Sequence, residues 1–198
     1  EIKECDWSSD VCSSDLSILL AIGISAVPII GPIIVMPSGA KFDPETDKTF
    51  LFALGPQNPF GPVVLLNGLP QPTAMQLRTR TKYRFRLINI STAFGSLRVA
   101  LKNNGALISW RLLKKDGADL PEAFTSQLSP ADLQVSVGET YDVEFETNDP
   151  QQILLEGSNP DGRRASQVLP ISRRRCCGSM RSTSCSNSTT RRNTCTAA

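Results

Sequence analysis

The side chains best suited to metal or redox chemistry are unevenly distributed in this 198-residue chain, which has six cysteines and no histidine. Without imidazole it cannot form a Ser-His-Asp or Cys-His catalytic site, a His-ligated zinc site or a copper centre of the usual kind. No Cys-x-x-Cys pair is present, so the spacing does not favour zinc. The cysteines lie near the ends, at Cys5, Cys12, Cys176, Cys177, Cys185 and Cys195. The middle of the chain is therefore expected to fold without disulfides.

The charge divides the chain into three parts. Residues 1–16 carry one lysine and five acids, and residues 173–198 carry six arginines and no acid. Between them, fourteen basic and fourteen acidic residues cancel, so the parts sum to the net charge of +2 (−4, 0 and +6). Such a balance gives no strong field to hold DNA or RNA, and we expect no nucleic-acid partner.

Neither end has the pattern of a folded segment. Residues 6–16 resemble the translation of a short sequencing adapter, so residues 1–16 are expected to lie outside the native protein, and residues 1–30 stay undefined. The Arg-, Ser- and Cys-rich residues 173–198 show no apolar period. Three interpretations of this tail stay open, namely an off-frame translation, a disordered basic tail, or, as the weakest, a metal-binding tract.

Residues 17–36 form the most apolar stretch, and about 20 apolar residues can span a bilayer. Pro28, Gly31 and Pro32 interrupt its second half, so a continuous spanning helix is not expected. A secretory signal with a small-residue cleavage site at 38–40 is the stronger alternative, although only Lys3 precedes it as a basic residue. We expect no membrane span and predict a buried strand over residues 31–36.

Short apolar runs separated by turn residues fill the middle of the chain. From 82 to 87, apolar side chains at odd positions alternate with cations at even ones, which is typical of a strand with one face in the core and one in water. No segment keeps the 3.6-residue period of a helix. The runs lie at 49–54, 63–66, 82–90, 96–102, 107–113, 133–137, 141–145, 153–155 and 168–169. They predict an all-β, antiparallel sandwich or barrel.

The outward positions of two predicted strands carry opposite charges. Positions 82, 84 and 86 are cationic, whereas 142, 144 and 146 are carboxylates. One interpretation is structural, with the two rows pairing across strands or facing water. The other is an interface stripe that faces another domain. The cationic row is too short, and too poor in aromatic residues, to predict a nucleic-acid platform.

Several phrases follow one another in a family-like order over residues 31–171. The first are Gly31-Pro-Ile-Ile-Val35, Phe42-Asp-Pro-Glu-Thr-Asp47 and Thr49-Phe-Leu-Phe52. The next are Leu66-Asn-Gly68 and Tyr83-Arg-Phe-Arg-Leu-Ile-Asn-Ile90. The last are Ser109-Trp110, Lys115-Asp-Gly-Ala-Asp-Leu-Pro121 and Val137-Gly-Glu-Thr-Tyr-Asp-Val-Glu-Phe145. Together they resemble the bacterial laccase-like members of the multicopper oxidase family.

This resemblance implies a Greek-key cupredoxin-like sandwich. Residues 31–48 would be the end of a first cupredoxin domain and a linker, and residues 49–172 a second cupredoxin domain. The family oxidises phenols, aromatic amines or metal ions and reduces dioxygen to water, with copper ligands in His-x-His and His-Cys-His phrases of its first and last domains. None of these phrases occurs here. We therefore expect a copper-free middle domain, inactive alone, from a periplasmic or secreted enzyme whose flanking domains carry copper.

The resemblance also suggests where a middle domain could contact substrate or its neighbours. Asp116 and Asp119 could accept a hydrogen bond from a phenol or amine, or face a metal ion; alternatively, they form an Asp-Gly turn that bonds its own backbone. Trp110 could line the cleft or pack in a sandwich core. Tyr141 could form a structural tyrosine-corner bond. No catalytic, cofactor-binding or metal-ligating residue is predicted.

Two other classes of protein stay open. A stand-alone extracellular β-sandwich that binds or adheres to a partner would need no metal. A sandwich tethered to a membrane through residues 17–36 is the other possibility, and the solubility of residues 31–172 without detergent would separate it from the rest. The copper-enzyme interpretation requires histidine-rich phrases on both sides of the sequence.

Overall fold

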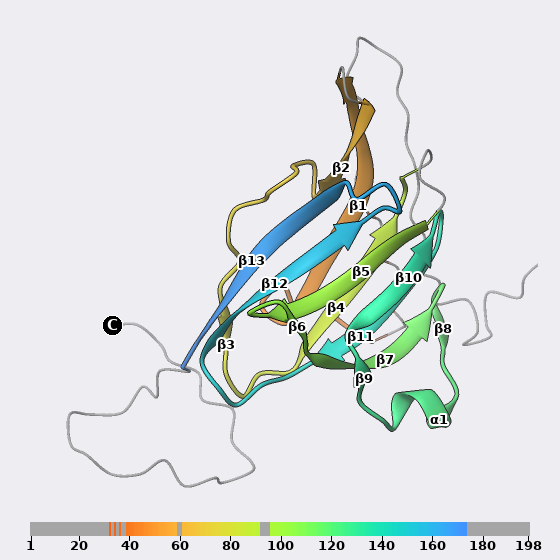
Figure 1. The fold of residues 1–198 in the computed structure, drawn as a ribbon. Coiled ribbons are helices and arrows are strands. Elements are labelled where there is room, and N and C mark those ends of the chain that lie inside the picture. The colour runs from red at the N-terminus through yellow and green to blue at the C-terminus, as the bar shows by residue number, and fades with distance from the viewer. Residues whose placement is uncertain are drawn as a thin grey trace, which may run out of the picture.

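The computed structural model describes residues 39–58, 61–91 and 96–173, together with residues 32, 34 and 36. For residues 56–58, 61 and 62 it describes the backbone only. The described part is almost entirely β-structure (Figure 1). Its first strands are β1 (Asp47–Asn58), β2 (Gly61–Leu66), β3 (Leu77–Arg78), β4 (Tyr83–Asn89), β5 (Ser96–Asn103), β6 (Ala106–Leu107) and β7 (Ser109–Lys115). They are followed by β8 (Ala118–Asp119), α1 (Glu122–Thr125), β9 (Ser129–Pro130), β10 (Asp132–Ser136), β11 (Thr140–Phe145), β12 (Gln151–Ser158) and β13 (Arg164–Ser172).

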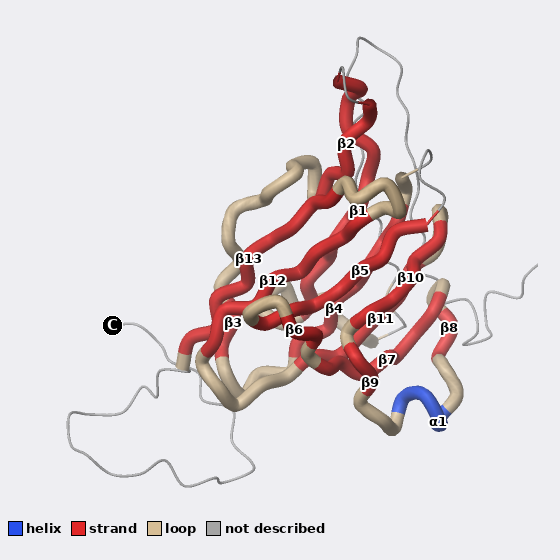
Figure 2. Tube along the Cα trace, viewed as in Figure 1, coloured by secondary structure: helices blue, strands red, loops and turns tan. Residues whose placement is uncertain are grey.

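The strands form two sheets that pack face to face. Sheet A has the order β2-β1-β4-β11-β7-β8, with β9 attached to β7. Sheet B has the order β10-β5-β12-β13-β3, with β6 attached to β5. In Figure 2 the far ends of β1 and β2 project beyond the other strands, and the short helix α1 lies at the opposite end of the molecule. The predicted all-β sandwich is confirmed.

Two strand pairs differ from the predicted antiparallel arrangement. β1 pairs with β4 in parallel, from Asp47 opposite Arg84 to Phe52 opposite Asn89, and β13 pairs with β3 in parallel. The reason is the path of the chain. After β2 it crosses to β3 in sheet B and returns to sheet A as β4, which then runs in the same direction as β1.

The core lies between the sheets and is rich in aromatic residues. Phe50 and Phe85 meet edge to face, with ring centroids 5.2 Å apart, and Phe85 stacks on Phe145 at 5.7 Å. Aliphatic side chains from sheet B close the other side, among them the fully buried Leu97, Val99, Leu101, Ile153, Leu155 and Leu169. The apolar positions predicted to face the core in 82–87 and 96–102 do face it. The opposite face of β4, predicted to lie in water, is buried at Arg86, because the chain leading into β1 covers it.

Three sequence expectations differ from the structure or lie outside it. Residues 32, 34 and 36 belong to no strand, contrary to the strand predicted over 31–36. The strand predicted over 133–137 stops one residue earlier, because β10 ends at Ser136 and Val137 is exposed. The adapter-like segment, residues 17–30 and almost all of the tail lie outside the described residues, and no helix among the residues placed here is long and apolar enough to cross a membrane.

Candidate functional site

Asp116 lies in the tight turn between β7 and β8. Asp116 and Gly117 both have positive φ, 49° and 79°, a conformation that Asp-Gly pairs adopt readily in hairpin turns. The Asp116 N–H donates to the carbonyl of Thr140 (2.9 Å), and its Oδ1 accepts from the Thr140 N–H (2.8 Å). The carboxylate is therefore engaged with the backbone of β11. The Asp-Gly turn considered for the sequence is present, but the Asp116 side chain bonds a neighbouring strand rather than the backbone of its own turn.

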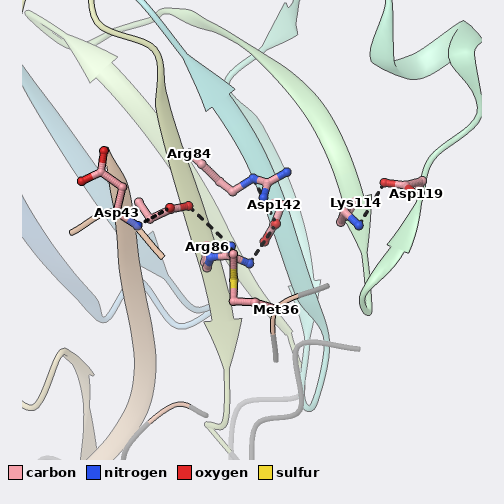
Figure 3. A network of polar contacts seen from close by, with 8 residues as sticks. Met36, Asp43, Arg84, Arg86, Lys114, Asp119 and Asp142 are labelled. Carbon is pink, nitrogen blue, oxygen red and sulfur yellow. Dashed lines mark hydrogen bonds and ion pairs between the residues drawn. The ribbon is translucent and has the colours of Figure 1, made fainter. Parts of the chain in front are cut away.

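Asp119 and Trp110 lie in contrasting surroundings. The Asp119 carboxylate is exposed at the edge of sheet A, 3.1 Å from Lys114 Nζ (Figure 3). Trp110 is fully buried in the core, and its indole N–H has no hydrogen-bond acceptor among the described residues. The described surface has two hollows, one at an end of sheet A and one on sheet B, and none of the three predicted contact residues lines them. A role for them as substrate or interdomain contacts stays a prediction.

The two rows of opposite charge meet on the outer face of sheet A. β4 and β11 pair antiparallel, so Asp142 lies opposite Arg86 and Glu144 opposite Arg84. Arg86 Nη1 donates to Asp142 Oδ2 at 3.1 Å, and Arg84 Nε lies 3.5 Å from the same oxygen. The predicted cross-strand charge pairing is confirmed.

Burial increases steadily along this row. The exposed side-chain fraction falls from 64% at Lys82 to 35% at Arg84 and 4% at Arg86. The chain that leads into β1 lies at the buried end (Figure 3), where Met36 Sδ is 3.7 Å from Arg86 Nη2. Asp47 accepts from Arg86 (3.4 Å) and from the Asp43 N–H (3.1 Å). The ionic row therefore fixes the entry of the chain into the sandwich.

The exposed end of the row opens into a cleft of about 410 Å³. Glu144 accepts from Arg111 Nη1 at 2.8 Å and lies 3.6 Å from Lys82 Nζ. Glu146, two residues further along the same face, makes no hydrogen bond or ion pair with any residue that the structure places. Leu128 and Ile108 supply apolar surface on the wall. Sequence reasoning missed this cleft, because its residues are far apart in the chain and no motif connects them.

A second hollow, of about 540 Å³, lies on the outer face of sheet B. Arg98 holds Asp132 with two hydrogen bonds, of 2.7 and 2.6 Å, and these keep the pKa of Asp132 below its usual value. Gln134 donates to Ser96 at 2.7 Å. The polar groups of this hollow are thus already bonded to one another, in contrast to Glu146 in the first.

The tyrosine-corner bond considered for Tyr141 is found at another tyrosine. The bond from a tyrosine hydroxyl back to the backbone is made by Tyr83, whose oxygen accepts from the Arg78 N–H at 2.7 Å. Tyr141 instead lies beneath Lys115, with Nζ 5.4 Å from the ring centroid. Lys115 also pairs with Glu139 at 2.7 Å, which lowers the pKa of Glu139 and raises that of Lys115.

The donor set does not fit copper. Histidine is absent from the whole sequence, and all six cysteines lie outside the described residues. Within the part of the chain that is placed, no three Cys, Asp or Glu side chains gather in a way that could hold a metal ion.

Comparison with solved structures identifies the fold. No protein-family model matches the sequence, and no curated protein sequence does either. A multicopper oxidase crystal structure is similar with a TM-score of 0.56 and 14% identity, over 73% of this chain and 50% of that one. Fet3p, a multicopper oxidase that functions in iron import, gives 0.53 and 13%, over 80% and 34%. CueO, a laccase-like multicopper oxidase from the lignin-degrading bacterium Ochrobactrum sp., gives 0.53 and 18%, over 72% and 36%.

Two facts follow from these similarities. The chain spans between about a third and a half of the length of each of these multicopper oxidases. At identities below 20%, the likeness concerns the fold alone. The chain thus has the cupredoxin-like β-sandwich fold found in multicopper oxidases.

Proposed function

We propose that this chain is a copper-free cupredoxin domain of a laccase-like multicopper oxidase, located between two domains that carry the copper. The observation that carries the proposal is the extent of the structural likeness. Most of this chain, but only 34–50% of each oxidase, takes part in the match. The order of the family-like phrases over residues 31–171 and the absence of histidine support the same conclusion.

In this role the domain contributes packing and positioning rather than electron transfer. The outer face of sheet A is the surface that we assign to the preceding domain, because the chain enters there and Met36, Asp43 and Asp47 lie at its buried end. Asp119 is the predicted contact residue best able to reach a neighbour, since its carboxylate is exposed at the edge of that sheet. Asp116 is held by Thr140, and Trp110 contributes through the core.

The parent enzyme would oxidise phenols, aromatic amines or metal ions and reduce dioxygen to water, in the periplasm or outside the cell. All copper ligands would come from the flanking domains, because an imidazole-based centre needs histidine and this chain has none. The chain by itself is expected to be inactive.

Long-read sequencing of the source DNA through both ends of the coding region tests the proposal. We expect His-x-His phrases upstream and a His-Cys-His phrase downstream, in frame with residues 31–172. An intact reading frame with its own start codon before residue 1 and a stop codon after residue 198 would overturn the proposal. The function would then be sought in the alternative class, a stand-alone β-sandwich that binds a partner.

A further inference from the structure

The cleft at the exposed end of sheet A has features of a binding site that the proposed function does not use. Its volume of about 410 Å³ falls within the range of about 300–1,000 Å³ typical of small-molecule sites. It lies where β11 ends and β7 begins, and its lining combines strand residues such as Arg111 and Glu144 with residues outside the strands, among them Ile108, Leu128 and Glu146. The paired strands hold one part of the cleft in a fixed position.

The charges in the cleft are unequally satisfied. Arg111 and Lys82 both approach Glu144, at 2.8 and 3.6 Å, so Glu144 has two ionic partners. Glu146 is exposed and has no ionic or hydrogen-bonding partner among the residues that the structure describes. The charged groups of the lining sum to zero, but the carboxylate of Glu146 touches no cation, and an ammonium group is its chemical complement.

Part of the lining of this otherwise polar cleft is apolar. Leu128 is 66% exposed, although a leucine side chain gains free energy when it is covered, and the half-buried Ile108 also faces the cleft. An inorganic cation would leave this apolar surface in water. A cation with a hydrocarbon body would cover it.

The segment that follows Glu146 is held in place before any ligand arrives. The Thr147 carbonyl accepts from the Arg80 N–H at 2.8 Å, and the Thr147 hydroxyl accepts from the Asp149 N–H (3.3 Å) and from Gln151 Nε2 (3.2 Å). Such preorganisation lowers the entropy cost of binding.

We propose that this cleft binds a small organic amine, with its ammonium group against Glu146 and its apolar body against Leu128 and Ile108. The site goes beyond the proposed function and does not depend on it, because any cupredoxin-like sandwich with these side chains would form it. Both the charged and the apolar part of the ligand are needed.

The full chain can be titrated with 2-phenylethylamine, followed by two-dimensional ¹⁵N–¹H NMR at low ionic strength. We expect saturable shifts at residues 146–149, at Gln151 and at Leu128, with a Kd of about 1 mM, as befits a small ligand. The neutral analogue 2-phenylethanol should bind about fivefold more weakly, because it lacks one exposed ion pair. The absence of saturable shifts, or equally tight binding of 3-phenylpropionate, would overturn the proposal.

Three variants separate the contributions. Glu146→Gln should remove the preference for the amine over the alcohol. Glu122→Gln, the same change at an exposed position on α1 outside the cleft lining, should leave that preference unchanged. Leu128→Ser should weaken both ligands by about threefold. Unchanged binding in Glu146→Gln, or equal losses in the two glutamate variants, would contradict the assignment, and neither result bears on whether the parent is a copper enzyme.

Discussion

Each sheet carries an Arg–Asp pair on its outer face, and the two pairs lie in opposite environments. Arg98 and Asp132 on sheet B form two short hydrogen bonds, yet the Arg98 side chain is 62% exposed. Arg86 Nη1 and Asp142 Oδ2 on sheet A form a longer bond, of 3.1 Å, and both side chains are almost completely buried. The pair with the shorter hydrogen bonds is therefore the more solvent-exposed one.

This difference separates the quality of an ion pair from its importance for stability. Water and salt screen the sheet B pair, so its good geometry contributes little to the free energy of unfolding. On sheet A, both charges have lost their water, and removing one partner leaves the other poorly compensated. The pair with the poorer geometry is therefore expected to be the more costly one to break.

The largest effect is expected from Asp142→Ala. It takes a carboxylate away from both Arg86 and Arg84, at 3.1 and 3.5 Å, in a buried location. We expect a loss of about 3–5 kcal/mol in the free energy of unfolding, as for other broken buried pairs. Urea unfolding followed by tryptophan fluorescence measures it, because Trp110 is fully buried. The matched control is Asp132→Ala on sheet B, and similar losses in both variants would refute the comparison.

Replacing both members of the buried pair should cost less than replacing Asp142 alone. Arg86→Met/Asp142→Leu removes both charges of the pair, and such replacements of buried pairs are often neutral or stabilising. Asp47, which is 12% exposed, loses Arg86 as a partner, so the double variant should keep part of the loss. The remaining Arg84 and Asp47 are more exposed than Arg86 and Asp142. Urea unfolding of the single and double variants gives the coupling between the two sites. Losses that simply add would mean that the pair does not act as a unit.

Alternation and turn chemistry predicted much of this fold. The Asp-Gly turn at Asp116 is one of the two interpretations of its sequence, and cross-strand pairing is one interpretation of the opposite charges at even positions of residues 82–86 and 142–146; the structure shows both. The parallel pairing of β1 with β4 could not be predicted, since alternation fixes which face a residue occupies but not which strand lies beside it.

The site was less predictable than the fold, because it depends on contacts between distant segments. Arg86 and Asp142 have the same sequence pattern as exposed charges, and their burial depends on the chain around Met36 and Asp47. Leu128 and Glu146 line the same cleft although they lie 18 residues apart in the sequence. Their placement depends on how β9, β10 and β11 are arranged in the sheets, which no local sequence pattern encodes.

Glu144→Gln should reduce the free energy of unfolding by an amount between those of Asp142→Ala and Asp132→Ala. Glu144 lies one pair closer to the open end of the row than Asp142, and its partners Arg111 and Lys82 are partly or largely exposed. We expect a loss of about 1 kcal/mol, because part of the interaction is screened. Urea unfolding places this variant between Asp142→Ala and Asp132→Ala. A loss as large as that of Asp142→Ala would show that burial does not set the order.

The smallest effects are expected from acid titration of the exposed pairs. Arg98 lowers the pKa of Asp132, and Lys115, together with the Ser136 N–H, lowers the pKa of Glu139. A carboxylate whose folded pKa is depressed contributes stability above its unfolded pKa of about 4, and that stability is lost as the pH falls through the folded value.

The stability advantage of the parent protein over Asp132→Asn and Glu139→Gln should therefore shrink as the pH falls below about 4. Urea midpoints at pH 7, 5 and 3 measure this change. At pH 7, raising the salt concentration should reduce the Asp132 effect, because Arg98 faces water. It should leave the Asp142→Ala loss nearly unchanged, because salt does not reach a buried pair. Equal salt sensitivity of the two would mean that the sheet A pair is solvated in solution, and the contrast between the two faces would no longer hold.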